Sequence, residues 1–434
     1  MQLHIIGLGV SATAQLDKTA LKALHSADQV IGSCRQLATV SHLLQSHQQQ
    51  ILLPKLKQLK LDLMAQQESA TSIVVLASGD PLLYGIGRWF SRTFDSSTLA
   101  FYPAVSSIQA ACHRLGRAFQ DMQVLSLHGR PLISIRRHLK HHQALIILTD
   151  KYSTPQALAQ ECIDNGFAQS KLTVLELLGY EGEKISTYTA LELVEDKQLI
   201  SQTFDPLHVT LIEPQGLGNV LPEFPGIADH KFVTDQGEGK GMITKREIRL
   251  SILSLLQPAK ADCIWDIGAG CGSVSIELSF WNPEAQVHAI EYHPNRLACL
   301  KQNQTKFGVT DNLHIVEGKA SEVVGDLPKP NKVFIGGSGG ELSHLLAQAW
   351  QALPVNGALV VSAVTEKTRQ QVFSFYESRL LAQDSEFESL QISVSKGDLL
   401  AGQLMYRPSL PVVLSRFQKR QPIQTNTETA HDQY

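Results

Sequence analysis

A glycine-rich segment in the second half of the chain has the residue types needed to hold a nucleoside against the backbone. In IWDIGAGCGSVSIE, residues 264–277, an apolar run ends in Asp266 and is followed by three alternating glycines. A glycine turn between a strand and a helix lets the backbone approach a ligand, and the helix N-terminus supplies N–H donors. The spacing is not that of a dinucleotide-binding loop, because Ser273 stands where the third glycine of G-x-G-x-x-G would be.

An acid at each of two neighbouring strand ends favours S-adenosylmethionine as the ligand. Its amino acid part is zwitterionic and has no phosphate, so Asp266 can meet the ammonium group. The next predicted strand ends in HAIEY, which puts Glu291 where a carboxylate can accept both ribose hydroxyls. The alternative is a tight turn followed by a solvated glutamate. We therefore predict a site for S-adenosylmethionine at this loop.

The first half has small and hydroxyl residues at its own predicted strand ends. They are Gly7 and Gly9 in HIIGLGVSA, Gly79 and Asp80 in LASGDPLLYGIG, and Ser106 and Ser107 in FYPAVSSIQAACHRLG. Asp80 follows a strong apolar strand and can accept from a ligand amine or hydroxyl. The two serines precede a helix, and the alternative is that they only cap it.

The elements that position these residues alternate between strand and helix in both halves, which predicts an α/β protein. A chain of 434 residues is too long for one ordinary core and predicts two domains. The alternation stops after HVTLIEP, where QGLGNVLPEFPGIADHKFV is rich in Gly and Pro. In the second half it predicts a doubly wound sheet with its ligand at the carboxyl ends of the strands. The predicted divisions are a domain over 1–213, a linker over 214–226, a domain over 227–416 and a disordered, polar tail over 417–434.

Composition argues against several classes of protein. The formal net charge of -3 disfavours a nucleic-acid binder, and no apolar run is long enough to span a membrane. The first residues have no basic region, so we expect no signal peptide. The six cysteines show no CxxC spacing, which predicts reduced thiols and a cytoplasmic protein without a metal site. HLKHHQ, residues 138–143, is better explained as a solvated helix face than as a metal site.

The second half resembles a known family. GMITKREIRLSILSLL, WDIGAGCGSVSIE, EYHPNRLACLKQN, VEGKASEVVGDLPKPNKVFIGGSGGE and ALVVSAVTEKT look like the decarboxylating precorrin methyltransferase domain of cobalamin biosynthesis, over about residues 225–410. The resemblance implies a Rossmann-like fold that binds S-adenosylmethionine. Carried over by position, the cofactor-binding residues are Thr244, Gly268, Ala269, Gly270, Cys271, Gly272, Glu291 and Ala320. Lys319 departs from the pattern, because this fold often places an acid near there to hold the adenine amine.

The first half resembles the tetrapyrrole methylase family, a second and unrelated S-adenosylmethionine fold. SGDPLLYGIG, PAVSSIQAA, SLHGR, LTDKYSTPQALAQ and LELLGYEGEKI look most like its precorrin-6Y branch, over about residues 1–213. The resemblance implies that Gly79, Asp80, Ser106 and Ser107 line a cofactor pocket between two lobes. The opening loop departs from the common Gly-x-Gly-Pro-Gly form, since Val10 and Ser11 follow Gly9.

Together the two resemblances imply one tetrapyrrole substrate that is methylated twice. The first half would methylate a precorrin at carbon 5, and the second would methylate carbon 15 and decarboxylate the ring C acetate. Isolated relatives of both domains assemble, so we expect a homo-oligomer. The candidates for proton transfer or for holding substrate carboxylates are His128, Lys245 and Arg246, with Arg114, Arg117 and Arg130 as further carboxylate ligands. The basic cluster of Lys240, Lys245, Arg246 and Arg249 could hold substrate carboxylates or could equally only decorate a helix.

Two rival functions remain open at this stage. Both folds also occur in RNA methyltransferases, but the chain lacks a basic stripe with stacking aromatics. Its fourth strand in the second half ends in VFIGGSGGE, residues 333–341, without the Asn- or Asp-Pro-Pro segment that accepts amine hydrogens. The other rival is a non-catalytic protein that binds S-adenosylmethionine or a tetrapyrrole as a sensor or carrier. Cofactor binding without product formation would identify it.

Overall fold

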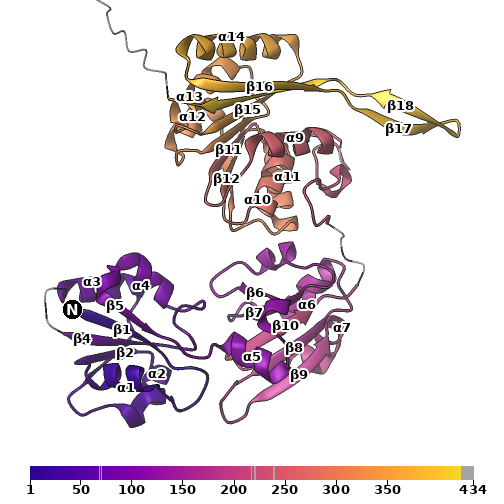
Figure 1. Ribbon diagram of the computed structural model, residues 1–434. Coiled ribbons are helices and arrows are strands. Elements are labelled where there is room, and N and C mark those ends of the chain that lie inside the picture. The colour runs from indigo at the N-terminus through magenta and orange to yellow at the C-terminus, as the bar shows by residue number, and fades with distance from the viewer. Residues whose placement is uncertain (68, 70, 217, 219–220, 238–239, 422–434) are drawn as a thin grey trace, which may run out of the picture. The chain divides into compact units, whose positions relative to one another are not determined.

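The computed structural model divides the chain into two compact units, residues 1–219 and 220–434, which are described separately here as unit 1 and unit 2 (Figure 1). The structure describes residues 1–421 except 68, 70, 217, 219, 220, 238 and 239. Among these residues no helix has the length and apolar character that a membrane crossing requires. In the same part of the chain, no group of three or more His, Cys, Asp or Glu side chains is placed to hold a metal ion.

Unit 1 begins with a five-stranded parallel sheet of order β3-β2-β4-β1-β5. Its strands are β1 (Gln2–Gly7), β2 (Gln29–Gly32), β3 (Gln49–Leu52), β4 (Ser72–Ala77) and β5 (Leu99–Tyr102). The accompanying helices are α1 (Lys18–His25), α2 (Cys34–Val40), α3 (Leu56–Ala65) and α4 (Gly87–Thr93). The two central strands β1 and β4 are adjacent and parallel, so the turns that follow them meet at the same edge of the sheet.

The second half of unit 1 forms a separate sheet of order β6-β7-β10-β8-β9. It contains β6 (Met122–Ser126), β7 (Ala144–Leu148), β8 (Lys171–Glu176), β9 (Lys184–Thr189) and β10 (His208–Glu213), with helices α5 (Ser107–Leu115), α6 (Pro155–Asp164), α7 (Ala190–Glu195) and α8 (Lys197–Ile200). Only β6 and β7 pair in parallel in this sheet, although alternation of strands and helices favours parallel pairing. The connection between β8 and β9, residues 177–183, is too short for a crossover, so these strands are antiparallel.

Unit 2 has one seven-stranded sheet of order β13-β12-β11-β14-β15-β19-β16, of which the first five strands are parallel. The strands are β11 (Cys263–Ile267), β12 (Gln286–Glu291), β13 (Leu313–Glu317), β14 (Lys332–Ile335), β15 (Ala358–Ala363), β16 (Ser385–Ile392) and β19 (Val412–Lys419). The helices are α9 (Arg246–Leu256), α10 (Ser273–Trp281), α11 (Pro294–Lys306), α12 (Ala320–Val323), α13 (Leu342–Ala352) and α14 (Glu366–Ala382). The strand order reverses beside β11, which is where such sheets bind ligands.

Successive side chains of β11 point to opposite faces of the sheet and so enter two different cores. Ile264 packs in a cluster with residues of α9, α10 and α11, whereas Trp265 and Ile267 pack in a cluster with residues of α13 and α14. Helices therefore cover both faces of the sheet (Figure 1), as the strand–helix alternation predicts. The polar Asp266 points to the same face as Ile264, because side chains alternate along a strand.

The C-terminal part of unit 2 corrects one sequence prediction. A disordered tail was expected from residue 417, but residues 417–419 belong to β19, which pairs with β15 and β16. Phe417 is fully buried while its neighbours are partly exposed, so the segment follows the two-residue period of a strand despite its polar composition. The remainder of the expected tail from residue 422 lies outside the described residues.

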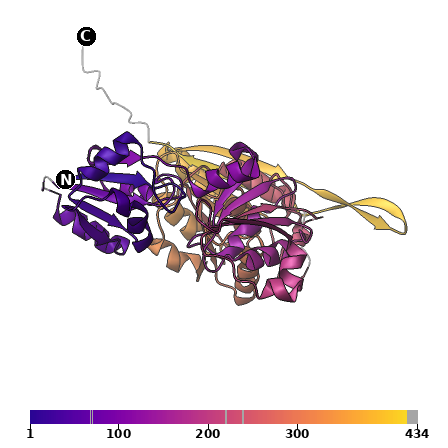
Figure 2. The ribbon, with the colours of Figure 1, turned by 90° about the horizontal axis from the view of Figure 1, so that it is seen from below.

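A hairpin of β17 (Ser395–Leu400) and β18 (Gln403–Pro408) was not predicted from the sequence. It extends beyond the rest of unit 2 in both views (Figures 1 and 2). Every residue of the two strands is exposed. The segment lacks the half-buried alternation by which a strand is usually recognised in a sequence.

Candidate functional site

Unit 1 contains a cavity of about 1350 Å³. Five of the six residues predicted there to bind the cofactor line it, namely Gly9, Gly79, Asp80, Ser106 and Ser107. They lie in the turns after β1 and β4 and at the start of α5, and residues of β7 and β10 also line the cavity. The sixth, Gly7, does not line the cavity. A Cβ at Gly7 would lie 2.7 Å from the carbonyl oxygen of Gly79, so this glycine allows the two turns to pack together.

The turns after β1 and β4 are pinned to each other by their backbones. Gly79 donates its N–H to the carbonyl of Gly9 at 3.1 Å, and Gly9 donates to the carbonyl of Gly79 at 3.4 Å. Both residues have positive φ angles, +68° and +63°, which side chains disfavour. The result is a rigid pair of turns at the cavity wall.

Asp80 and Ser106 already have partners within the protein. One oxygen of Asp80 accepts the N–H groups of Leu82 and Leu83 at 2.8 and 3.1 Å, and the other accepts that of Ala104 at 3.3 Å. Ser106 forms a capping box with Gln109 at the start of α5. Asp80 retains capacity to accept a further donor, because each carboxylate oxygen has two acceptor positions.

Four cations line the same cavity without a carboxylate partner. Among the described residues, no carboxylate oxygen lies within 4.0 Å of a side-chain nitrogen of Arg35, Arg88, Arg130 or Lys151. Arg130 was predicted from the sequence, but the other three stand alone in their segments and no spacing singled them out. A cavity with unpaired cations favours an anionic ligand.

The other two arginines expected to hold substrate carboxylates do not line the cavity. Arg114 pairs with Glu183, with its Nε 2.5 Å from Oε1, and Arg117 pairs with Glu213. The hydrogen bond that Arg114 donates to Glu183 raises the pKa of Arg114, so its charge is engaged in that pair. Both arginines therefore form structural ion pairs on the surface of unit 1.

Asp150 helps to shape the loops beside these cations. Burial opposes its ionisation, but hydrogen bonds from the N–H groups of Gly129, Tyr152 and Ser153 lower its pKa to about 2. Its negative charge is thus committed to the backbone of the loops that carry Arg130 and Lys151. The charge left to meet a ligand is positive.

Two histidines line the cavity, and only His128 was predicted. His208, at the start of β10, donates from Nδ1 to the carbonyl of Asp205 at 2.7 Å, since a carbonyl can only accept. Its Nε2 lies 2.9 Å from the hydroxyl of Thr149, which donates to the carbonyl of His208 at 3.2 Å. His208 thus lies at the cavity wall with its ring fixed by Asp205 and Thr149, which no motif of HVTLIEP indicated.

The glycine loop of unit 2 packs more tightly than any residue with a side chain would allow. Gly268, Gly270 and Gly272 all have positive φ angles, of +73°, +59° and +88°. A Cβ at Gly268 would lie 2.4 Å from the carbonyl of Gly337, and one at Gly270 would lie 2.7 Å from that of Met242. The loop is therefore fixed between the end of β14 and the segment before α9.

The N–H groups of this loop are satisfied within unit 2. Gly268 and Ala269 both donate to the carbonyl of Ile290 at 3.0 Å, Cys271 donates to Met242 and Gly272 donates to Ala269. Gly270 donates to Oε2 of Glu291 at 2.8 Å. The glycines thus serve close approach of the backbone, and the loop N–H groups are not free donors.

Glu291 lies at the loop as predicted, at the end of β12. It is almost fully buried, and its Oε1 accepts the N–H groups of Tyr292 and His293 at 2.9 and 2.8 Å. Its Oε2 has the single contact with Gly270. That oxygen has one acceptor position left for a ribose hydroxyl.

Asp266 has an unsatisfied oxygen beside the same loop. Its Oδ2 accepts from the hydroxyl of Ser275, whereas its Oδ1 is buried without a hydrogen-bond partner among the described residues. Burial raises its pKa to about 7, with a further contribution from the charge of Glu291. A buried carboxylate oxygen without a partner is costly unless a ligand supplies a donor. An ammonium group such as that of S-adenosylmethionine fits this requirement.

The remaining predicted residues lie around this loop and along unit 2. The carbonyl of Thr244 accepts from Nη1 of Arg249 at 2.6 Å and from the hydroxyl of Ser273 at 3.3 Å. Lys245 and Arg246 follow it at the start of α9. Ala320 begins α12 after β13, and the preceding Lys319 is exposed, with its Nζ 3.9 Å from Glu322.

Comparisons with known proteins confirm both resemblances. A family model described as "Tetrapyrrole (Corrin/Porphyrin) Methylases" matches residues 2–194, and one described as "Precorrin methyltransferase domain" matches residues 235–419.

Relatives match the whole chain as well as its parts. The chain is 36% identical over 413 residues to the precorrin-6Y C(5,15)-methyltransferase [decarboxylating] of Sinorhizobium sp, covering 94% of each chain. It is 30% identical over 418 residues to the protein of the same name from Mycobacterium tuberculosis, covering 96% of this chain and 99% of the relative. A probable cobalt-precorrin-6B C(15)-methyltransferase (decarboxylating) of Pyrobaculum aerophilum is 34% identical over 191 residues, 44% of this chain and 94% of the relative. Since the full-length matches join the two domains in one chain, this protein belongs to the decarboxylating precorrin-6Y C(5,15)-methyltransferase family.

Proposed function

We propose that this protein is an S-adenosylmethionine-dependent enzyme of cobalamin biosynthesis. It methylates a precorrin at carbons 5 and 15 and removes carbon dioxide from the ring C acetate. The observation that carries the proposal is the match over 94% of the chain to a relative named for this reaction. The cation-lined cavity of unit 1 supports it, because a precorrin carries many carboxylates.

We assign the carbon 15 methylation and the decarboxylation to unit 2. The precorrin methyltransferase model matches residues within unit 2 only. The shorter relative from Pyrobaculum aerophilum, which matches 44% of this chain, is named for the carbon 15 reaction alone. The carbon 5 methylation then belongs to unit 1.

In unit 1 the protein positions an anionic substrate beside the cofactor. Arg35, Arg88 and Lys151, with Arg130, hold the substrate carboxylates, while the turns after β1 and β4 hold the cofactor. The cofactor supplies a methyl group activated by a sulfonium. The meso carbon of the reduced macrocycle is already nucleophilic, so orientation of the two reactants is the main contribution, worth about 7–11 kcal/mol in favourable cases.

Loss of a macrocycle proton must follow the carbon 5 methylation. We assign its acceptance to Nε2 of His208, whose ring is oriented by the hydrogen bond from Nδ1 to the carbonyl of Asp205. His128 lies on the same cavity and is the second candidate. A general base needs to lie within hydrogen-bond reach of the proton that it accepts.

In unit 2 the cofactor site consists of Asp266, Glu291 and the glycine loop. Oδ1 of Asp266 accepts from the ammonium group, and Oε2 of Glu291 accepts from a ribose hydroxyl. Lys245 and Arg246, next to Thr244, are the candidates to hold the substrate carboxylates. The conjugated imine of the substrate takes up the electron pair that the departing carbon dioxide leaves.

We also propose that the enzyme works in the cytoplasm as a homo-oligomer with no nucleic-acid or membrane partner. The net charge of -3 supports the absence of a nucleic-acid partner. The exposed apolar side chains of the hairpin, with Leu399 at 70% and Tyr406 at 68% exposure, support self-association. Light scattering of the full chain would measure its assembly, and a monomer at micromolar concentration would contradict it.

The experiment that tests the function is mass spectrometry of a precorrin-6 tetrapyrrole after incubation with the protein and S-adenosylmethionine. The wild type is expected to add two methyl groups and remove one carbon dioxide. Two variants separate the units. Gly79→Val strains a positive φ and puts a side chain 3.3 Å from Cα of Ser106, and Gly268→Val clashes with Gly337.

Gly268→Val should give a singly methylated product that keeps its carboxylate, and Gly79→Val a singly methylated product that has lost carbon dioxide. The control is Gly116→Ala, because Gly116 also has a positive φ, of +61°, but a Cβ there has no neighbour within 4 Å and the residue does not line the cavity. If Gly268→Val gave the decarboxylated product and Gly79→Val the product that keeps its carboxylate, the assignment of the two reactions to the units would be reversed. An unchanged tetrapyrrole despite cofactor binding would contradict the function and favour an RNA substrate or a sensor.

A further inference from the structure

A fully buried ion pair lies beside the cofactor loop of unit 2. Arg249 on α9 and Glu277 on α10 are both 0% exposed, and Nε of Arg249 donates to Oε1 of Glu277 at 2.5 Å. Moving two charges out of water costs several kcal/mol per ion in typical proteins, so such a pair needs further hydrogen bonds. Arg249 is one of the basic residues that the sequence offers for substrate carboxylates or for decorating a helix, but its side chain is buried in this pair. Glu277 belongs to no predicted cofactor or substrate set.

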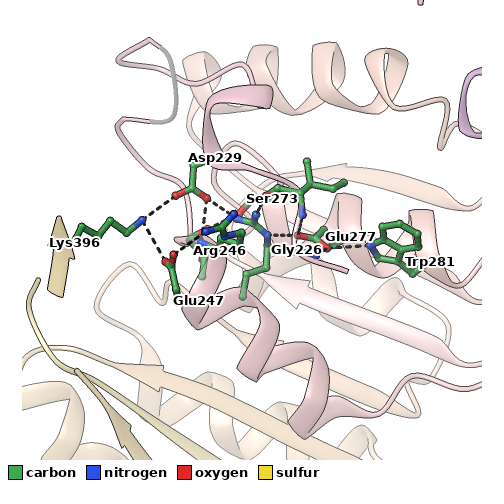
Figure 3. Close-up of polar contacts among 11 residues, drawn as sticks. Gly226, Asp229, Arg246, Glu247, Ser273, Glu277, Trp281 and Lys396 are labelled. Atoms are coloured by element: carbon green, nitrogen blue, oxygen red, sulfur yellow. Dashed lines mark hydrogen bonds and ion pairs between the residues drawn. The ribbon is translucent and has the colours of Figure 1, made fainter. Parts of the chain in front are cut away.

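The additional bonds of this pair hold the chain that leads into α9. Nη1 of Arg249 donates to Thr244 at 2.6 Å and to Oδ1 of Asp229 at 3.2 Å, and Nη2 donates to the carbonyl of Ile227. Glu277 accepts the N–H groups of Gly226 and Ile227 at 2.7 and 3.0 Å. Figure 3 shows Glu277 between Gly226 and Trp281, with Asp229 on the other side of the network.

The same chain segment is bonded to the glycine loop. Ser273, the first residue of α10, donates its hydroxyl to Thr244 at 3.3 Å. Cys271 donates its N–H to the carbonyl of Met242 at 3.1 Å, and Met242 donates its own N–H to Asp235 at 3.0 Å. Residues 242–244 are therefore fixed between Arg249 on one side and the loop on the other.

A lysine of the hairpin completes the charge balance of this network. Nζ of Lys396 on β17 lies 3.3 Å from Oε2 of Glu247 and 3.7 Å from Oδ2 of Asp229 (Figure 3). The ionised side chains are the cations Arg246, Arg249 and Lys396 and the anions Asp229, Glu247 and Glu277. Three charges of each sign cancel, and removal of Lys396 leaves an excess negative charge next to Arg249.

We propose that Arg249 is a positioning residue that sets the cofactor affinity of unit 2 through Thr244, and that Lys396 couples the hairpin to it through Asp229. This inference rests on the proposed function, since it requires unit 2 to bind S-adenosylmethionine. A planar guanidinium reaches four acceptors in fixed directions at once, which an ammonium cannot do. The excess charge left without Lys396 draws Arg249 toward Asp229 and away from Thr244.

The test measures S-adenosylmethionine binding to each unit of the full chain separately. Hydrogen exchange of peptides over residues 240–250 and 264–277 reports the site of unit 2 during a titration. Peptides over residues 76–90 report unit 1 in the same sample and serve as an internal control. Arg249→Lys should weaken binding to unit 2 about tenfold, as expected for a lost charge-assisted bond, and leave unit 1 unchanged. Trp281→Phe is its control, because it removes one bond to Glu277 and none to Arg249.

The milder variant is Lys396→Met, since the lysine side chain is 49% exposed. It should weaken binding to unit 2 about twofold to fivefold at low salt, and the difference should shrink at high salt. Lys396→Arg should restore binding. The matched control is Arg407→Met, which removes the 3.3 Å pair of Arg407 and Asp398 on the same hairpin without reaching the network.

The outcomes distinguish a failure of the hairpin coupling, of the role of Arg249 and of the cofactor assignment. Equal affinities of Lys396→Met and wild type at low salt would overturn the coupling of the hairpin. Unchanged affinity in a folded Arg249→Lys variant would overturn its positioning role. A wild-type unit 2 without protection by S-adenosylmethionine would overturn the inference together with the cofactor assignment of the proposed function.

Discussion

Two carboxylates at neighbouring strand ends of unit 2, Glu291 and Asp266, differ in how many hydrogen-bond partners the protein gives them. Glu291 accepts three backbone N–H groups, so both of its oxygens have partners whether or not a ligand is bound. Asp266 has one hydroxyl donor and one buried oxygen without a partner. The cofactor site of unit 2 thus combines a satisfied acid that shapes the loop with an unsatisfied one that needs a ligand donor.

Asp266 makes the stability of unit 2 depend on pH. Its pKa of about 7 in the folded protein exceeds its ordinary value of 3.8, so the folded state keeps a proton that the unfolded chain releases. The free energy of unfolding of unit 2 is therefore expected to fall as the pH rises from about 4 to 7. Asp266→Asn should reduce this decrease. Urea unfolding with pulsed hydrogen exchange at several pH values resolves unit 2 from unit 1, and identical profiles of variant and wild type would refute the expectation.

Arg88 is the clearest single test of the carboxylate site in unit 1. Arg88→Gln removes an unpaired cation from the cavity, so the KM for the tetrapyrrole should rise about tenfold, with little change in kcat. The affinity of unit 1 for S-adenosylmethionine should not change. Steady-state kinetics of the carbon 5 methylation measures both parameters. Arg114→Gln is the control, because Arg114 pairs with Glu183 and does not line the cavity, and an equal rise of KM in both variants would contradict the assignment.

At the scale of the elements, turns place the cavity walls by close backbone approach. The turn after β8 brings Gly179, with a φ of +75°, against the segment that follows β1. A Cβ there would lie 1.8 Å from the carbonyl oxygen of Val10, a residue that lines the cavity. The two sheets of unit 1 therefore meet at a point where only glycine fits.

Gly179→Ala should weaken cofactor binding to unit 1, because the new methyl group must displace Val10. Gly182→Ala is the matched control. Both positions have positive φ and incur about 1 kcal/mol of backbone strain, but the atom nearest to a Cβ at Gly182 is 3.5 Å away. Binding measured by hydrogen exchange should weaken in Gly179→Ala only. Equal affinities in the two variants would show that the approach to Val10 does not matter.

The elements also show where sequence patterns suffice. The strands from β11 to β15 are apolar and each is followed by a helical pattern, so their order predicts the doubly wound sheet. β16, β17 and β18 are exposed along most of their length and carry no such signal. They are strands because of their partners, which a local pattern does not contain.

At the scale of the whole molecule, the two units have separate cores. Four hydrophobic clusters consist of unit 1 residues and two of unit 2 residues, and none of the six, over the described residues, mixes the units. Each unit is thus expected to unfold as a unit of its own. A change of conditions that acts on a buried group in one unit should leave the other folded.

Acid pH is expected to act on a buried group of unit 1, the side chain of His138. Burial, with nearby positive charges, lowers its pKa from 6.5 to about 4, and its Nδ1 accepts from Gln123 at 2.9 Å. The unfolded chain binds the proton more readily, so unit 1 should lose up to about 3 kcal/mol of stability as the pH falls from 6.5 to 4. Unit 2 should gain stability from Asp266 in the same range. Urea unfolding with pulsed exchange of both units tests this, and His138→Asn should flatten the profile of unit 1 alone.

The sequence by itself determined the residues that act through local position. Asp266, Glu291 and the loop glycines lie at the ends of adjacent parallel strands, so their spacing already implies that they meet. Only the tertiary structure decided which charges are free. Arg35, Arg88 and Lys151 reach one cavity from distant segments, whereas Arg114 and Arg117 are paired with glutamates. The buried pair of Arg249 and Glu277 likewise depends on the packing of α9 against α10. Strand ends follow from local periodicity, but ion pairs depend on which segments the fold brings within about 4 Å of each other.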